Sequence, residues 1–244
     1  MIMVRNWSRR PNMAFMKFIK SLALPSEMLP PIIEEESHFD PETEHSAAKL
    51  GMWLFLATEL LLFGGLFAAY AIFRAKYPEM FLAGSESLDV VLGTINTVIL
   101  IFSSYTVAIA VSAIQENKIR LVRWMLWITI ICAAIFAVNK YFEYSYKISN
   151  GFTPGTDIFY SIYYAATGVH MLHVFIGMAV LGVLLKKLNE GRYHKGNFTA
   201  IEIGGLYWHL VDLIWIYLFP LLYLLRSNHG NSNTYKQYFI YGYY

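Results

Sequence analysis

Two pairs of polar residues interrupt stretches of this sequence that otherwise suit a hydrocarbon environment. His170 and His173 lie in YYAATGVHMLHVFIG, and His209 and Asp212 lie in GGLYWHLVDLIWIYLF. The members of each pair are three positions apart, so an α-helix places both side chains on one face. Such a face can hold a metal ion or a haem, or it can form hydrogen bonds with a neighbouring helix or a bound lipid.

The segments that carry these residues are long and apolar. Hydrophobic residues make up 57% of the 244 positions, and charged residues make up 15%, well below the roughly 25% usual for soluble domains. The apolar runs exceed the roughly 20 residues that cross a bilayer core, and they are longer than the helices of most soluble bundles. The sequence therefore predicts an all-α, polytopic membrane protein, a bundle of five transmembrane helices. The predicted spans are 50–73, 89–114, 121–142, 158–185 and 203–225.

Glu59 lies deep in the first predicted span, in GMWLFLATELLLFGGLFAAY. It follows Leu50 by nine residues, or about 14 Å along a helix, which is nearly mid-membrane. An ionisable group there costs at least about 2.5–3.5 kcal/mol to insert, so we expect a protonated carboxyl or a donor from a neighbouring helix. Gly64 and Gly65 follow and predict close helix contact. Two roles stay open: an interhelical contact, or a function in proton movement or at a subunit interface.

A further pair, Lys140 and Glu143, stands near the end of the third predicted span in AVNKYFEYSYKIS. The two residues are three positions apart and close to the expected membrane interface. This spacing predicts a local ion pair.

The spacing of the polar residues also bears on which ligands the chain binds. A di-iron bundle requires Glu-x-x-His on two helices, and no such repeat occurs here. A haem would need opposed histidines on two helices, which His173 and His209 could provide. The spacing favours a hydrogen-bonded polar cluster between helices over either kind of site. The net charge of +2 gives no case for nucleic acid as a partner.

Basic residues are unevenly divided between the two sides that five spans define. The N-terminal segment and the loops at 115–120 and 186–202 carry most of the Lys and Arg. Positive-inside bias therefore predicts a cytoplasmic N-terminus and a periplasmic C-terminus. The predicted parts of the chain are an extended cytoplasmic arm at 1–47, a transmembrane domain at 48–226 and a periplasmic tail at 227–244.

Four stretches together resemble subunit III of the haem-copper respiratory oxidases, the cytochrome c and quinol oxidases. The span with Thr58-Glu59 resembles the helix that carries the family's buried glutamate, and KYFEYSY resembles its Glu-Tyr-Tyr-Glu segment. TDIFYSIYYAATGVHMLHVFIGM is similar to the family's Thr-Gly-x-His-x-x-His helix, and GLYWHLVDLIWIYLF to its Tyr-Trp-His-x-x-Asp-x-x-Trp helix. Their order and spacing agree over about residues 48–226.

The sequence departs from the family pattern in two ways. The long form of the family has seven helices with a lipid-filled cleft, whereas five spans match the shorter bacterial form. The second glutamate of the Glu-Tyr-Tyr-Glu segment is Tyr146 here, while Glu143 keeps the first.

The resemblance implies a non-catalytic core subunit of a proton-pumping terminal oxidase in the bacterial inner membrane. Haem and copper then belong to partner subunits I and II, and this chain holds no catalytic residue, cofactor or metal. It binds phospholipid, stabilises the catalytic subunit, supports proton uptake and could join a respiratory supercomplex. The implied functional polar cluster is Glu59, Glu143, His170, His173, His209 and Asp212, with Glu59 at the position of the family's reactive carboxyl.

Two other functions stay open at this point. The chain could be a short subunit III relative that accompanies a nitric oxide reductase. It could instead be a membrane electron-transfer protein that holds a haem between His173 and His209. The electron donor of the complex, cytochrome c or quinol, is not readable from the sequence.

Overall fold

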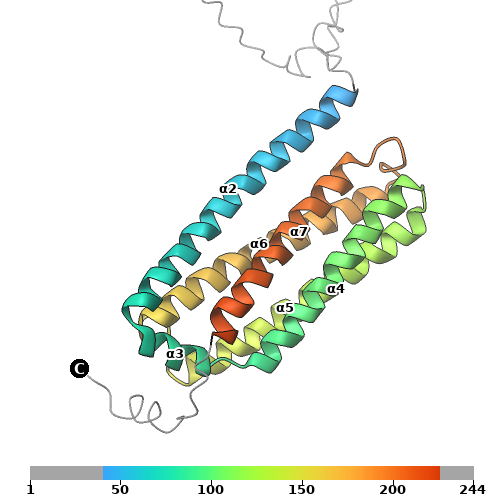
Figure 1. Cartoon of the computed structure of the whole chain (residues 1–244). Coiled ribbons are helices and arrows are strands. Elements are labelled where there is room, and N and C mark those ends of the chain that lie inside the picture. Colours follow the sequence, from blue (N-terminus) through green and yellow to red (C-terminus); the bar gives the residue numbers. More distant parts are fainter. Residues whose placement is uncertain (1–40, 226–244) are drawn as a thin grey trace, which may run out of the picture. The chain divides into compact units, whose positions relative to one another are not determined.

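The computed structural model describes residues 41–225, and over this range every named element is a helix. Five of these helices are long and apolar enough to cross a membrane, which confirms the predicted spans. A short helix, α3, lies between the first two and was not predicted (Figure 1). The elements are α2 (Pro41–Lys76), α3 (Pro78–Glu86), α4 (Val90–Gln115), α5 (Ile119–Ser149), α6 (Ile158–Asn189), α7 (Thr199–Phe219) and the π-helical turn η2 (Pro220–Leu224).

Two helices, α2 and α5, extend furthest beyond the predicted spans. α2 begins at Pro41, so the last residues of the predicted arm are helical, and proline suits the first turn of a helix because its missing N–H has no partner there anyway. α5 continues to Ser149, well beyond the predicted end at residue 142, because its last turns bury their charged residues inside the protein. The rest of the predicted arm and the tail lie outside the described residues.

Aspartates begin two of the spanning helices. Asp89 Oδ1 accepts hydrogen bonds from the N–H groups of Val91 and Leu92 at 2.9 and 3.1 Å, at the start of α4. Asp157 Oδ1 accepts from the N–H of Tyr160 at 2.9 Å at the start of α6, and burial raises the pKa of this carboxyl. These side chains satisfy N–H groups that have no carbonyl partner inside the helix.

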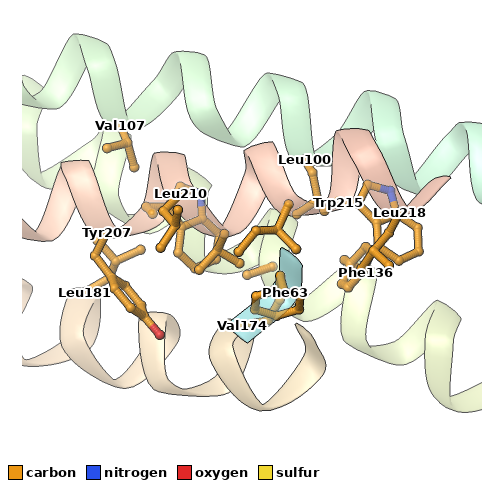
Figure 2. Packing of buried hydrophobic residues seen from close by; sticks show 14 of the residues in the cluster. Phe63, Leu100, Val107, Phe136, Val174, Leu181, Tyr207, Leu210, Trp215 and Leu218 are labelled. Atoms are coloured by element: carbon orange, nitrogen blue, oxygen red, sulfur yellow. The ribbon is translucent and has the colours of Figure 1, made fainter. Parts of the chain in front are cut away.

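α7 is the central helix of the packed core. In its most apolar stretch 61% of residues are buried, compared with 17% in α2. α7 packs against α4 and α6, and α5 closes the bundle against the same two helices. Figure 2 shows this core, in which side chains from several helices interdigitate. Its labelled residues include Leu100, Val107, Phe136, Val174, Leu181, Leu210, Trp215 and Leu218.

Pro220 ends α7 and changes the hydrogen-bond pattern of the following turn. Proline has no N–H to donate, and the chain continues as the π-helical turn η2. Two carbonyls of this turn accept hydrogen bonds from other helices: Leu221 from the Tyr70 hydroxyl of α2 at 2.6 Å, and Leu222 from the Ser85 hydroxyl of α3 at 2.8 Å. The turn therefore ties α2 and α3 to the end of α7.

Glycines allow close approach at some helix contacts but not at the one predicted. A Cβ on Gly84 of α3 would lie 2.2 Å from the ring of Phe159, and one on Gly177 of α6 would lie 2.8 Å from Trp208. The prediction for Gly64 and Gly65 is wrong within this chain, because nothing lies within 4 Å of a Cβ at either position. These two glycines lie on the exposed surface of α2 instead, where no side chain projects from them.

Gly84→Ala is expected to destabilise the protein, because the ring of Phe159 is fully buried and has no room to move away. Overpacking of this kind costs about 1–3 kcal/mol, partly offset by the roughly 0.5–1 kcal/mol that alanine gains over glycine in a helix. The midpoint of thermal unfolding in detergent should fall by several degrees. Gly168→Ala is the matched control, since its Cβ meets open space. Equal midpoints for the two variants would contradict the packing of α3 on α6.

Candidate functional site: polar contacts between the spanning helices

Glu59 and His173 form a hydrogen bond between α2 and α6. Glu59 Oε2 lies 2.9 Å from His173 Nε2, and His173 Nδ1 donates to the carbonyl of Val169 at 2.8 Å. Because Nδ1 donates to the Val169 carbonyl, a neutral His173 carries its proton on Nδ1, and its Nε2 then accepts a hydrogen bond from a protonated Glu59. If His173 is charged instead, Nε2 also carries a proton and donates to the Glu59 carboxylate. In both cases one proton lies between Glu59 and His173. The prediction of a neighbouring-helix partner for Glu59 is confirmed.

The surroundings of this pair combine burial with limited access. Glu59 lies near the midpoint of α2 and His173 near the midpoint of α6. Their side chains are 14% and 9% exposed. The ring of Phe63 packs edge-on against His173 at 5.4 Å. Apolar groups thus cover most of the pair but leave a small part of each side chain accessible. The pair lies near the middle of the two helices, where burying an ionisable group in a membrane costs most.

α2 makes polar contacts with the bundle at its start as well as at Glu59. His45 Nδ1 lies 2.7 Å from the Thr199 hydroxyl, and Lys49 forms an ion pair with Glu202 at 2.8 Å. Together with the Tyr70 contact at the other end, these interactions attach α2 at three levels. The sequence analysis did not identify the contacts at the start.

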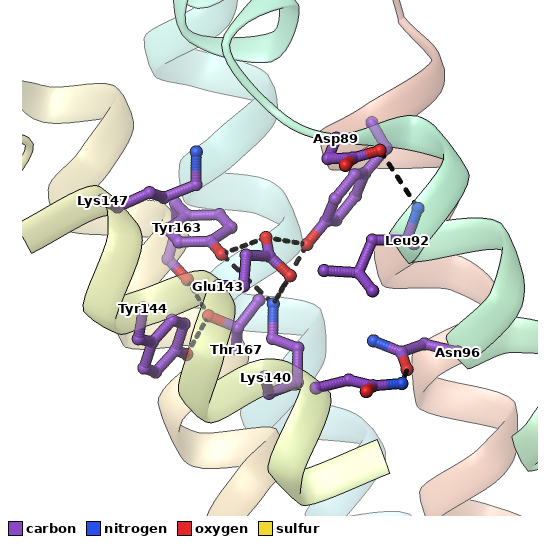
Figure 3. A network of polar contacts seen from close by, with 12 residues as sticks. Asp89, Leu92, Asn96, Lys140, Glu143, Tyr144, Lys147, Tyr163 and Thr167 are labelled. Atoms are coloured by element: carbon purple, nitrogen blue, oxygen red, sulfur yellow. Dashed lines mark hydrogen bonds and ion pairs between the residues drawn. The ribbon is translucent and has the colours of Figure 1, made fainter. Parts of the chain in front are cut away.

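Lys140 and Glu143 form the predicted ion pair, at 3.0 Å, but it is buried rather than interfacial. Their side chains are 1% and 4% exposed. Tyr163 of α6 and Tyr223 of η2 each donate to Glu143 Oε1 at 2.6 Å, and Lys140 Nζ donates to both hydroxyls. Figure 3 shows this closed network, in which dashed lines connect Lys140, Glu143 and Tyr163. The network joins α5, α6 and η2.

Lys147 extends the same face of α5 and was missed in the sequence. It lies seven residues after Lys140 and is 3% exposed, and its ammonium donates to the carbonyl of Ser87 at 3.2 Å. The regular spacing of Lys140, Glu143 and Lys147 in the sequence was the available signal, since all three lie on one helix face. By contrast, Tyr146 is 72% exposed and points away from this network.

His209 and Asp212 are not paired with each other. His209 Nδ1 hydrogen-bonds to the Ser104 hydroxyl of α4 at 2.6 Å. Asp212 is 2% exposed, and within residues 41–225 neither of its carboxyl oxygens has a hydrogen-bond partner. The Ser104 hydroxyl lies near that carboxyl, but its hydrogen bond goes to His209. The same-face spacing therefore did not predict the partner.

His170 differs from its neighbour His173 although both lie on one face of α6. Its ring is fully buried between Phe136 at 5.6 Å and Trp215 at 5.3 Å. Neither ring nitrogen has a hydrogen-bond partner in the described part of the chain. His170 therefore packs as an aromatic ring, whereas His173 forms hydrogen bonds.

The six predicted polar residues thus have different surroundings. Only Glu59 and His173 contact each other, and Glu143 belongs to the lysine–tyrosine network. Across residues 41–225, no three His, Cys, Asp or Glu side chains converge in a way that could hold a metal ion. His173 and His209, the pair considered for haem, have separate partners on α2 and α4.

A family model described as cytochrome c oxidase subunit III matches residues 1–227. The chain belongs to the cytochrome c oxidase subunit III family. It is a multi-pass membrane protein, and five helices within residues 41–225 can span the bilayer. The four motifs that suggested this family lie within the matched range.

Similar proteins carry two related names. Cytochrome c oxidase subunit 3 of Thermostichus vulcanus is 40% identical over 177 residues, which cover 72% of this chain and 86% of the relative. The protein of the same name from Corynebacterium diphtheriae is 33% identical, with 72% and 87% covered. A protein named probable quinol oxidase subunit 3 from Staphylococcus aureus is 29% identical, with 72% and 88% covered.

Lys140→Met is expected to destabilise this subunit III family member, because it leaves the Glu143 carboxylate buried without its cation. Removing one partner of a buried ion pair costs about 3–5 kcal/mol. The double variant Lys140→Met/Glu143→Leu removes both charges and should recover part of that loss. Thermal unfolding in detergent measures both effects, with Tyr146→Phe at the exposed position as control. A single variant as stable as the control would contradict the structural role of the network.

Proposed function

We propose that this chain is a non-catalytic core subunit of a bacterial terminal oxidase. It packs against the catalytic subunit I and against subunit II in the inner membrane, and the haem and copper centres belong to those partners. The observation that carries the proposal is the single-proton pair Glu59–His173, near the midpoint of a helix whose outer face is exposed within residues 41–225. The subunit also binds phospholipid. The partner subunits determine whether cytochrome c or quinol donates electrons to the complex.

The outer face of α2 supports a role in assembly. Leu50, Trp53 and Leu61 are 62%, 61% and 77% exposed. Gly64 and Gly65 lie on the same helix, and nothing in the described structure lies within 4 Å of a Cβ at either position. Such a face suits contact with a partner helix, because small residues let helix backbones approach closely in membranes.

The Glu59–His173 pair supports a role in proton movement. Either Glu59 or His173 can hold the shared proton. The proton can therefore be released and taken up while α2 and α6 stay in contact. We propose that the pair supports proton uptake by the catalytic subunit and so protects that subunit from loss of activity during turnover.

The buried lysines of α5 support the proposed orientation. Lys140 and Lys147 are inside the bundle, so they do not count as loop charges on the side of α3. Among residues 41–225, that side then retains Arg74 and Lys76. The opposite side carries a larger set, which favours a cytoplasmic location for it. That set is Lys49, Lys118, Arg120, Arg123, Lys186, Lys187, Arg192 and Lys195.

The experiment that tests membership of an oxidase complex is copurification of the full-length chain in mild detergent, with its partners identified by mass spectrometry. Subunits I and II should be present in equal amounts to this chain. Haem absorbance should remain with the partners when the subunits are separated. A Soret band that stays with this chain would overturn the non-redox assignment.

Glu59→Gln is expected to leave the complex assembled, because glutamine can still hydrogen-bond to His173, but it removes the exchangeable proton from the carboxyl. Turnover should inactivate the variant oxidase severalfold faster than the unmodified complex, as measured by oxygen consumption over time. Glu79→Gln, which alters an exposed carboxyl on α3, is the matched control. If both variants matched the unmodified complex, Glu59 would be left with a structural role only.

A further inference from the structure

An open groove runs along the outer surface between α5 and α6. It has a volume of about 770 Å³. Trp127 and Ile130 of α5 form one wall, and Phe175 and Met178 of α6 form part of the other. Gly182 lies in the α6 wall, and a Cβ there would meet nothing within 4 Å. The missing side chain at this position contributes to the hollow.

The distance along α6 from the innermost lining residue, Phe175, to Lys186 matches one leaflet of a membrane. Phe175 and Lys186, which both line the groove, are eleven positions apart on α6, and this separation corresponds to about 16 Å at 1.5 Å per residue. The hydrocarbon core of a bilayer is about 30 Å thick, so one leaflet contributes about 15 Å. The groove therefore reaches from the end of a spanning helix to about mid-membrane. A partner's transmembrane helix would cover the full thickness instead.

The outer end of the groove is cationic. Lys186 is exposed and forms no ion pair within residues 41–225. Glu190 also lines this end, but its carboxylate pairs with Arg192 at 3.0 Å. The free charge at the mouth of the groove is therefore an ammonium, which complements a phosphate group.

We propose that this groove binds one phospholipid, with an acyl chain along Gly182 and the phosphate at Lys186. The site rests on the membrane location and lipid binding in the proposed function. It adds a place, a leaflet-length acyl chain and an anchoring cation, all on the face between α5 and α6 and away from α2.

The test measures phospholipid bound to the purified complex by native mass spectrometry, after exchange into dioleoyl phosphatidylglycerol. Gly182→Leu adds a side chain in the groove at a position where a Cβ meets nothing within 4 Å, and it should weaken retention of one lipid about tenfold. Displacing two methylene groups from burial suffices for a loss of this size. Lys186→Gln should weaken the same lipid severalfold. Ala165→Leu places the same leucine side chain at an exposed position of α6 outside the groove and should change nothing.

Three results would overturn the site. The first is a Gly182→Leu complex that keeps the same number of lipids with the same affinity. The second is loss of a partner subunit instead of a lipid, which would place a protein helix in the groove. The third is displacement of the bound lipid by inorganic phosphate alone, which would show that the acyl chain does not contribute to binding. Each presupposes an assembled complex, so failure of the proposed function itself is recognised separately as absence of subunits I and II.

Discussion

Inside a membrane no water is available to pair with polar side chains, and this constraint organises the whole bundle. Lys140 and Glu143 illustrate it most clearly, because neither charge would be tolerated alone at 1% and 4% side-chain exposure. Two tyrosine hydroxyls from other elements complete their hydrogen bonds. The pair therefore requires α5, α6 and η2 to meet in one register, which helps to explain why α5 remains helical far past the apolar run.

The same constraint gives α2 its special position. It is the least buried of the spanning helices, yet polar contacts attach it at both ends and in the middle. Apolar packing alone would discriminate weakly between the bundle and the lipid tails, because both are hydrocarbon. The Glu59–His173 hydrogen bond and the Tyr70–Leu221 contact specify where α2 lies. In this way one contact can serve both helix attachment and the proposed handling of a proton.

Among residues 41–225, the buried side chains of His170 and Asp212 lack a hydrogen-bond partner at both of their polar atoms. They lie in the same interior as the satisfied contacts, with Trp215 against His170 and Ser104 near Asp212. Their burial costs free energy unless each is neutral.

The sequence by itself determined the class of protein, the five spans and the family. Hydrophobic length is a local property, and the motifs around Glu59, His173 and Asp212 lie within single helices. The sequence also placed Lys140 and Glu143 in contact, because i, i+3 neighbours meet on any helix. Contacts between helices were a different matter. Glu59 and His173 are 114 positions apart, and His209 bonds to Ser104 rather than to Asp212 on its own helix face. Only the tertiary structure decided these partners, because packing sets the rotation and register of each helix, and residue spacing along one helix carries no information about its neighbours.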